Sequence, residues 1–210
     1  MNINIKNILI ERTTNPKDAS KLYNILQSLL FTPDNYRNQK KSKLEKLSME
    51  GFIIGNHSKV DLEEMIQTPK NYIFVAKDKQ IESIAGNIIG YSLILRTDEI
   101  IKEVQHYADQ VDFTSTKAKK KIDEGNFIYL IQITIKKGYS NQGIGSKIMN
   151  FASKKIDIPI ISFVMKSPLR NEISLNFHLK NGFQHFGDYF GEYEGFPNYR
   201  SAGFIHFPKK

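Results

Sequence analysis

Two glycines that are one residue apart, Gly143 and Gly145, lie where a predicted strand over Phe127–Lys136 gives way to a predicted helix. The N-terminus of a helix presents free backbone N–H groups and about half a positive charge. Glycine there lets an anion approach the backbone without meeting a Cβ. The pattern therefore predicts a phosphate site on the amides of residues 142–146, with lysines at 136, 137 and 147 close by in sequence. The alternative is that the glycines only let the helix pack closely on the strand.

Two common phosphate-binding motifs do not fit this turn. The dinucleotide fingerprint G-x-G-x-x-G needs a small residue at position 148, which is Ile148. The P-loop needs Lys and then Ser or Thr after its second glycine. Gly138 and Gly143 have the P-loop spacing, but Ile144 and Gly145 follow. A phosphate bound here is therefore expected to use a different motif.

A second motif follows in "SPLRNEISLNFHLKNGF". Asn171 can cap a helix of about ten residues, and Asn181-Gly182 can end it in the left-handed conformation that glycine tolerates. Together with this segment, the run "IQITIKKGYSNQGIGSKIMNFA" resembles the acetyl-CoA signature of the GCN5-related N-acetyltransferases (GNAT), usually written Q/R-x-x-G-x-G/A. The resemblance covers Phe127–Phe186 and extends by element order back to Lys17.

The resemblance implies one domain over residues 1–210 with a mixed α/β fold. This fold has a central, mostly antiparallel sheet with a splayed pair of parallel strands and flanking helices. The resemblance also implies acetyl-CoA, or another acyl-CoA, as acyl donor and a primary amine as acceptor. The resemblance also assigns residues to the cofactor. Backbone groups of Ile133 and Ile135 would hold its pantetheine arm, and Asn171 would contact it from the other side. Its pyrophosphate would lie on the backbone amides of five residues, with Lys147 nearby: Gln142, Gly143, Ile144, Gly145 and Ser146.

The chain departs from the family pattern at two positions. Ser140 stands where the first motif residue is usually Arg or Gln, and His178 stands where many members have a tyrosine that acts as general acid. His178 can take that role, because an unperturbed histidine titrates at about 6.5. The alternative is that it only packs on its helix. Since the chain has no Cys, a cysteine-linked acyl-enzyme is excluded, and direct attack of the amine in a ternary complex is expected.

The strand before the glycine turn carries no carboxylate and offers only Tyr129 and Gln132 as polar candidates for catalysis. Gln132 can orient water but cannot remove a proton, and it is counted with His178 as a catalytic candidate. Other candidate acids, bases or amine-binding groups are three tyrosines and four carboxylates: Tyr189, Tyr193, Tyr199, Glu82, Asp188, Glu192 and Glu194. The acidic residues of Gly187–Arg200 favour a cationic acceptor. The histidines show no metal-ligand spacing, so no metal is expected.

Apolar residues at helical spacing predict helices over Lys17–Phe31 and near Ser42–Glu50, with a short turn at Asp61–Gln67. The helix after the glycine turn would bury Ile144, Ile148, Phe151 and Ala152. Strands are expected over Asn71–Asp78, Asn87–Arg96, Phe127–Lys136, Ile158–Lys166, Gln184–Phe190 and Ala202–Phe207. The polar segment 98–126 is expected to be a mobile insertion with a helix around Glu99–Asp109.

The composition is that of an ordinary soluble globular protein, with 40% apolar and 25% charged residues. The longest apolar run, Ile158–Met165, is too short to span a bilayer, so a cytoplasmic protein without membrane contact is expected. The net charge of +8 would attract nucleic acid, but no segment interleaves Lys or Arg with aromatic residues, so that partner is not expected. A homodimer through the C-terminal strands stays open. So does a second function, a non-catalytic acyl-CoA-binding sensor or interaction module of the same fold.

Overall fold

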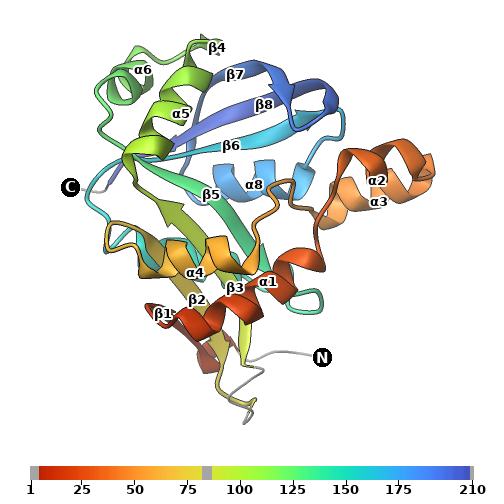
Figure 1. The fold of residues 1–210 in the computed structure, drawn as a ribbon, viewed down its shortest axis with the longest axis vertical. Coiled ribbons are helices and arrows are strands. Elements are labelled where there is room, and N and C mark those ends of the chain that lie inside the picture. The colour runs from red at the N-terminus through yellow and green to blue at the C-terminus, as the bar shows by residue number, and fades with distance from the viewer. Residues whose placement is uncertain (1–4, 82–86, 209–210) are drawn as a thin grey trace. The chain divides into compact units, whose positions relative to one another are not determined.

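The strands and helices of this chain alternate in the manner of a mixed α/β fold (Figure 1). The structure is a computed structural model that describes residues 5–81 and 87–208. Its strands are β1 (Ile8–Arg12), β2 (Tyr72–Asp78), β3 (Ile88–Leu95), β4 (Val111–Phe113), β5 (Ile128–Ile135), β6 (Ile160–Ser167), β7 (Gln184–Tyr193) and β8 (Phe196–His206). Its α-helices are α1 (Ala19–Gln27), α2 (Pro33–Asn38), α3 (Lys41–Glu50), α4 (Lys59–Gln67), α5 (Asp98–Ala108), α6 (Thr116–Asp123), α7 (Ile144–Ala152) and α8 (Glu172–Lys180).

The chain forms two compact units, each assembled from three segments. The first unit comprises Met1–Leu30, Gly55–Leu95 and Leu130–Asp157, and the second comprises Phe31–Ile54, Arg96–Tyr129 and Ile158–Lys210. Strand β5 runs through both, because its first two residues belong to the second unit and the rest to the first. The single domain predicted over residues 1–210 stays a prediction.

In the first unit, β1, β2 and β3 pair antiparallel in that order, and β5 is the next neighbour of β3. Every residue of β3 is buried, since α1 and α7 both pack on this strand. Gly90 on β3 faces β5 closely: a Cβ added there would lie 2.5 Å from Ile135 Cδ1 and 2.8 Å from the carbonyl oxygen of Thr134. A larger residue would therefore push β3 and β5 apart.

In the second unit, the strand order is β5-β6-β8-β7-β4. The first residues of β5 pair parallel with β6 in a short register, Ile128 with Ile160 and Tyr129 with Ile161. All other pairings in this unit are antiparallel. The predicted fold class, a mostly antiparallel sheet with one parallel pair and flanking helices, is confirmed.

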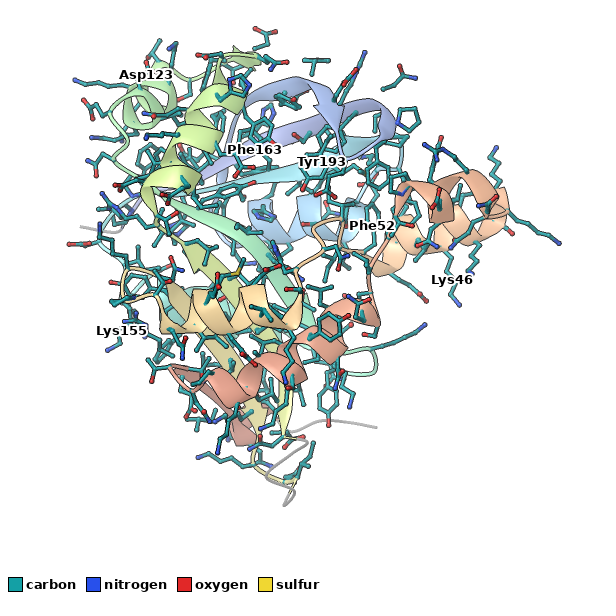
Figure 2. The ribbon with its side chains drawn as sticks, in the orientation of Figure 1. Lys46, Phe52, Asp123, Lys155, Phe163 and Tyr193 are labelled. Carbon is teal, nitrogen blue, oxygen red and sulfur yellow. The ribbon has the colours of Figure 1, made fainter. Side chains whose placement is uncertain are left out.

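Two apolar clusters fill the core of the second unit. One is built around Phe127, Phe186 and Ile161, together with four side chains of the predicted insertion, Val104, Ala108, Ala118 and Ile122. The other is aromatic and joins Phe31, Phe52, Met165, Tyr189, Phe196 and Tyr199, with Phe163 and Tyr193 packed against it (Figure 2). Segment 98–126 folds into α5, β4 and α6 and buries these apolar side chains, because both helices are amphipathic.

Most predicted helices and strands are confirmed within one to three residues at each end. The others were missed or predicted too short. The predicted turn at Asp61–Gln67 is wrong: it is the nine-residue helix α4, which begins earlier because Ser58 and Asp61 form a reciprocal capping box. The sequence analysis also missed β1, α2, β4 and α6, four elements of eight residues or fewer. The last two strands extend toward each other as a hairpin, so they are longer than expected.

Among the described residues, no helix is long and apolar enough to cross a membrane.

Candidate functional site

The glycine turn lies in the first unit, between the end of β5 and the start of α7. Gly143 is the N-cap of α7 and adopts a left-handed conformation with φ of +77°. No side chain caps the helix at this position. The amides in the first turn of a helix lack partners within it, and Gly143 is exposed while Gly145 and Ser146 are half-buried. The turn therefore presents open backbone N–H groups at the positive end of a nine-residue helix.

Helix α7 is held in place by its apolar side. Ile144, Ile148, Met149 and Ala152 are buried, and Phe151 meets Phe74 of β2 edge-on with ring centroids 5.5 Å apart. The predicted buried face is thus confirmed for Ile144, Ile148 and Ala152, while Phe151 is half-buried. Because Ile144 is the first helical residue and is 1% exposed, burial fixes the N-terminal turn directly beside Gly143.

Two polar side chains of the turn make local contacts. Gln142 Nε2 donates to the carbonyl oxygen of Gly138 at 3.2 Å, which closes the turn on itself. Lys147 Nζ donates to the carbonyl oxygens of Ile5 at 3.0 Å and Ile8 at 2.5 Å. The Lys147 ammonium is therefore directed at the N-terminal segment of its own unit, and its predicted contact with phosphate stays a prediction. Lys136 is exposed next to the turn.

The end of β5 carries the other predicted groups of the first unit. Ile133 and Ile135 are half-buried, in a strand whose side chains alternate between buried and half-buried. Gln132 is 6% exposed, and its Nε2 donates to the Tyr91 hydroxyl at 2.8 Å and to Thr134 Oγ1 at 3.2 Å. Burial raises the pKa of Tyr91. Gln132 is thus part of a buried polar network, and its predicted role in orienting water stays a prediction.

Asn171 lies in the second unit, where its side chain organises the start of α8. Its Oδ1 accepts from the Ser174 amide at 3.3 Å, which confirms the predicted cap. Its Nδ2 donates to the carbonyl oxygen of Phe52 at 2.9 Å. The side chain is 7% exposed, so both of its polar groups serve packing within the unit. Its predicted contact with the cofactor stays a prediction.

His178, on the same helix, is also a core residue. It is 3% exposed, its ring stacks on Phe204 at 5.2 Å and it meets Phe183 edge-on at 4.8 Å. Nδ1 lies 2.7 Å from the carbonyl oxygen of Ser174, and buried Nε2 has no hydrogen-bond partner among the described residues. Burial lowers the pKa of His178 to about 4. The imidazole is therefore neutral at pH 7 and lacks the second, acidic proton of an imidazolium, so this environment favours the packing role over the predicted acid.

Several tyrosines that the sequence analysis treated as separate candidates contact one another in the second unit. Tyr193 stacks on Tyr199 at 4.9 Å, Tyr199 meets Tyr189 at 6.0 Å, and Tyr189 meets Tyr107 of α5 at 5.4 Å. Tyr107 was missed because it lies in the predicted insertion, where no sequence signal connects it to β7 and β8. Burial raises the pKa of Tyr129 on β5 well above its ordinary value, so its hydroxyl stays protonated.

The remaining candidate groups are spread over the second unit. Asp188 pairs with Lys166 and with His185, and the hydrogen bonds to these partners outweigh burial and lower its pKa. Glu192 is exposed at the end of β7. Glu82 lies outside the described residues. Within residues 5–81 and 87–208, no group of three or more histidines and carboxylates could hold a metal ion.

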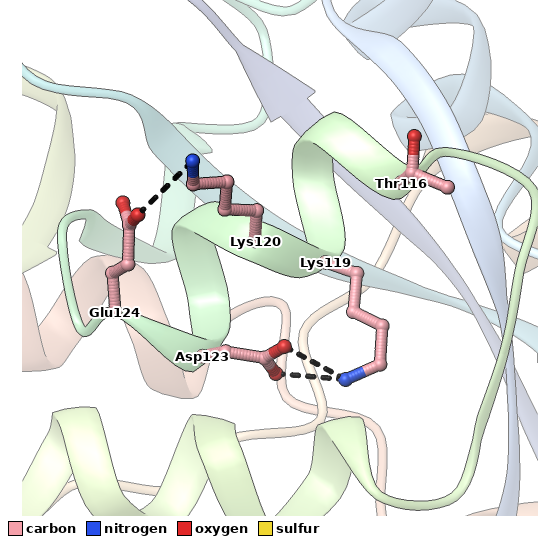
Figure 3. A pocket seen from close by; sticks show the side chains of 5 residues that line it. All are labelled: Thr116, Lys119, Lys120, Asp123 and Glu124. Atoms are coloured by element: carbon pink, nitrogen blue, oxygen red, sulfur yellow. Dashed lines mark hydrogen bonds and ion pairs between the residues drawn. The ribbon is translucent and has the colours of Figure 1, made fainter.

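Two surface hollows lie within the second unit. One, of about 330 Å³, runs along α6 and is lined by Thr116, Lys119, Lys120, Asp123 and Glu124 (Figure 3). Its charges pair with each other, Lys119 with Asp123 at 2.8 Å and Lys120 with Glu124 at 3.8 Å, as expected of a solvated helix face. The other, of about 450 Å³, is lined by eight residues between β6, β7 and β8: Lys166, Ser167, Arg170, Phe190, Gly191, Asn198, Tyr199 and Arg200.

Comparison with known proteins gives a family and a fold. Residues 41–183 match the model of the acetyltransferase (GNAT) family. The matched stretch contains both motifs on which the predicted resemblance rests, so that resemblance is confirmed. No curated protein sequence matches the chain.

Solved structures of low sequence identity share the fold. The crystal structure of Arabidopsis thaliana NAA60 in complex with acetyl-CoA is 17% identical, with 95% of this chain and 98% of that chain covered and a TM-score of 0.62. Spermidine N-acetyltransferase SpeG from Vibrio cholerae is 14% identical, with 96% and 94% covered and a TM-score of 0.55. An acetyltransferase of the GNAT family from Streptococcus pneumoniae is 17% identical, with 95% and 98% covered and a TM-score of 0.52.

Proposed function

Because the chain belongs to the GNAT acetyltransferase family, we propose that it is an N-acetyltransferase that moves an acetyl group from acetyl-CoA to a primary amine. The observation that carries the proposal is the left-handed, uncapped Gly143 at the start of α7. A diphosphate is the kind of group that open amides at a helix N-terminus bind. Structures of the same fold, such as that of Arabidopsis thaliana NAA60, have been determined with acetyl-CoA.

In this proposal the pyrophosphate of CoA accepts hydrogen bonds from the amides of residues 142–146. Gly143 has the positive φ that the turn needs, and it presents no side chain to the ligand. The exposed Lys136 adds positive charge beside the turn. The backbone groups of Ile133 and Ile135, at the end of β5, hold the pantetheine arm.

The chemistry proposed is direct attack, because a chain without Cys cannot form a cysteine-linked acyl-enzyme. When bound, acetyl-CoA supplies a thioester carbonyl that a neutral amine can attack. The N–C bond forms as the C–S bond breaks, and the proton lost by the amine balances the proton taken up by the thiolate. The protein contributes mainly by holding the two reactants together. His178 is not assigned a proton in this scheme, since burial keeps it neutral.

The experiment is calorimetric binding of acetyl-CoA and of CoA to wild type, Gly143→Asp and Gly138→Asp. Both glycines are exposed and have positive φ, +77° and +95°, so the two variants carry the same added charge and similar backbone strain. Only Gly143 is the N-cap of α7. We expect Gly143→Asp to bind at least about tenfold more weakly, and Gly138→Asp to stay within about twofold of wild type. A folded wild type that binds neither ligand would refute the proposal, as would equal losses in both variants.

One observation favours the second candidate function, a non-catalytic acyl-CoA binder. Both predicted catalytic side chains, His178 and Gln132, are less than 10% exposed and are engaged in packing or in a buried network. Release of free CoA thiol with a panel of primary amines decides between the two functions. Turnover above the rate without amine supports the acetyltransferase, and tight binding without turnover supports the sensor.

A further inference from the structure

The hollow of about 450 Å³ between β6, β7 and β8, here called the basic hollow, lies wholly within the second unit. Among the described residues, three cationic side chains line it and no acidic one does: Lys166, Arg170 and Arg200. Ser167 and Asn198 add a hydroxyl and an amide, which can both donate hydrogen bonds. The hollow along α6 differs, because its lysines pair with carboxylates that also line it. The basic hollow is therefore large enough, and of the right charge, for a small organic anion.

Two irregularities in the strand pairing border the basic hollow. The β6–β8 ladder changes register between Met165 and Ser167, so Lys166 is not paired with a residue of β8. The β7–β8 ladder changes register between Gly191 and Tyr193. Irregularities of this kind bend a strand and re-aim a side chain, and they are over-represented next to functional sites. Lys166 and Gly191 both line the hollow, so the backbone of a paired sheet fixes its shape.

Two of the three cations in the basic hollow have a carboxylate partner that does not line it. Lys166 pairs with Asp188, and Arg170 Nε donates to Glu172 Oε1 at 2.5 Å. Arg200 forms no ion pair with any residue in the described part of the chain. Three cations and two carboxylates leave one positive charge without compensation, and Arg200 carries it.

The Arg200 guanidinium lies over the ring of Phe190, with 4.7 Å between the guanidinium carbon and the ring centroid. A guanidinium carries five N–H donors in a planar fork. Within residues 5–81 and 87–208, the Arg200 side chain gives none of them to another residue. Phe190 is 43% exposed, so its ring adds apolar surface that is open to water. The basic hollow thus combines an unused donor fork with an exposed aromatic ring.

We propose that the basic hollow binds a small organic monocarboxylate with an aromatic body. The two oxygens of a carboxylate match the fork of the Arg200 guanidinium. Its single negative charge balances the single uncompensated positive charge, whereas a phosphate ester of charge near −2 would leave the site negative. The aromatic body packs on Phe190 and removes apolar surface from water. The inference goes beyond the proposed function and does not depend on it, because the glycine turn belongs to the first unit.

The test is titration of benzoate, benzamide and phenyl phosphate into the full-length protein at pH 7.5, followed by ¹H–¹⁵N NMR spectra that include the arginine Nε–H signals. The three probes share a ring and differ in charge. We expect wild type to bind benzoate with a Kd of about 1 mM or lower, and to bind benzamide at least about tenfold more weakly. Phenyl phosphate should bind more weakly than benzoate. The Arg200 Nε–H signal should shift with benzoate.

Three variants assign the binding to Arg200. Arg200→Gln removes both charge and fork, and Arg200→Lys keeps the charge alone. Lys43→Gln is the control, because it removes an exposed charge on α3 in the same unit, outside the basic hollow. Arg200 is exposed, so its replacement should leave the fold intact, which the same spectra report. We expect the Kd for benzoate to rise at least about tenfold in Arg200→Gln and about threefold in Arg200→Lys, and to stay within about twofold in the control.

Five results would each overturn the inference: no benzoate binding by a folded wild type, equal affinity for benzoate and benzamide, tighter binding of phenyl phosphate than of benzoate, an unchanged Kd in Arg200→Gln, or an equal loss in Lys43→Gln. The second and fifth would show that the charge of Arg200 is not what recognises the probe. The third would show that the site suits a phosphate rather than a carboxylate.

Discussion

Replacing His178 with Phe separates a packing role from a catalytic one. The imidazole is 3% exposed, stacks on Phe204 and leaves Nε2 without a partner. Phenylalanine keeps a planar ring in this position and removes the titration and the unpartnered Nε2, but it also removes the hydrogen bond between Nδ1 and the carbonyl oxygen of Ser174. At pH 7.5 we expect the free energy of unfolding to change by less than about 1.5 kcal/mol, as for a conservative exchange in a core.

The sharper expectation concerns pH. The unfolded chain binds a proton on His178 below about 6.5, whereas the folded chain resists protonation until about pH 4. Between these values the unfolded state holds more protons, so the wild type loses stability as the pH falls from 6.5 to 4. At pH 5, about 1.5 units below the pKa of the unfolded chain, His178 lowers the free energy of unfolding by about 2 kcal/mol, because each unit corresponds to about 1.36 kcal/mol. The Phe variant has no such loss and should gain this amount relative to wild type on acidification.

The assay is urea unfolding, followed by circular dichroism, of wild type and His178→Phe at pH 7.5 and pH 5.0. His106→Gln is the control, because it removes an exposed histidine on α5. If wild type and His178→Phe lose the same stability between the two pH values, burial of the imidazole does not control its protonation. Amine turnover gives the second readout. Activity retained within about threefold agrees with packing, whereas a loss of 100-fold or more, typical of a removed general acid, would refute the reasoning.

Two further substitutions test the elements that position the glycine turn and its unit. Gly90→Ala should destabilise the protein by about 1–3 kcal/mol, because the new Cβ would lie 2.8 Å from the carbonyl oxygen of Thr134. Thermal unfolding measures this loss of stability. An unchanged midpoint temperature would contradict the close approach of β3 to β5. Ser58→Ala should cost about 1 kcal/mol in free energy of unfolding, because it removes the capping box of α4. Ser42→Ala is the control, since Ser42 is an exposed serine on α3 that is not the N-cap of that helix, and equal effects of the two changes would count against the cap.

Much of the local structure could be predicted because it depends on neighbouring residues. The helix α7 follows from Gly143 and from the spacing of Ile144, Ile148 and Ala152, and the start of α8 follows from Asn171. The short elements β1 and β4 could not be predicted, since three to five residues carry too little periodicity and their strands exist only through pairing with β2 and β7.

The sequence by itself determined the family, the position of the glycine turn between a strand and a helix, and the absence of a cysteine nucleophile, because each depends on residue types or their spacing. Tertiary structure decided which polar residues are accessible. The sequence predicted His178 and Gln132 as catalytic candidates, but packing buries both side chains and keeps the His178 imidazole neutral. Tertiary structure also brought Tyr107 of α5 into contact with Tyr189 of β7, about 80 positions later in the chain. Burial and charge proximity are properties of neighbours in space, and the order of residues does not specify those neighbours until the strands have paired.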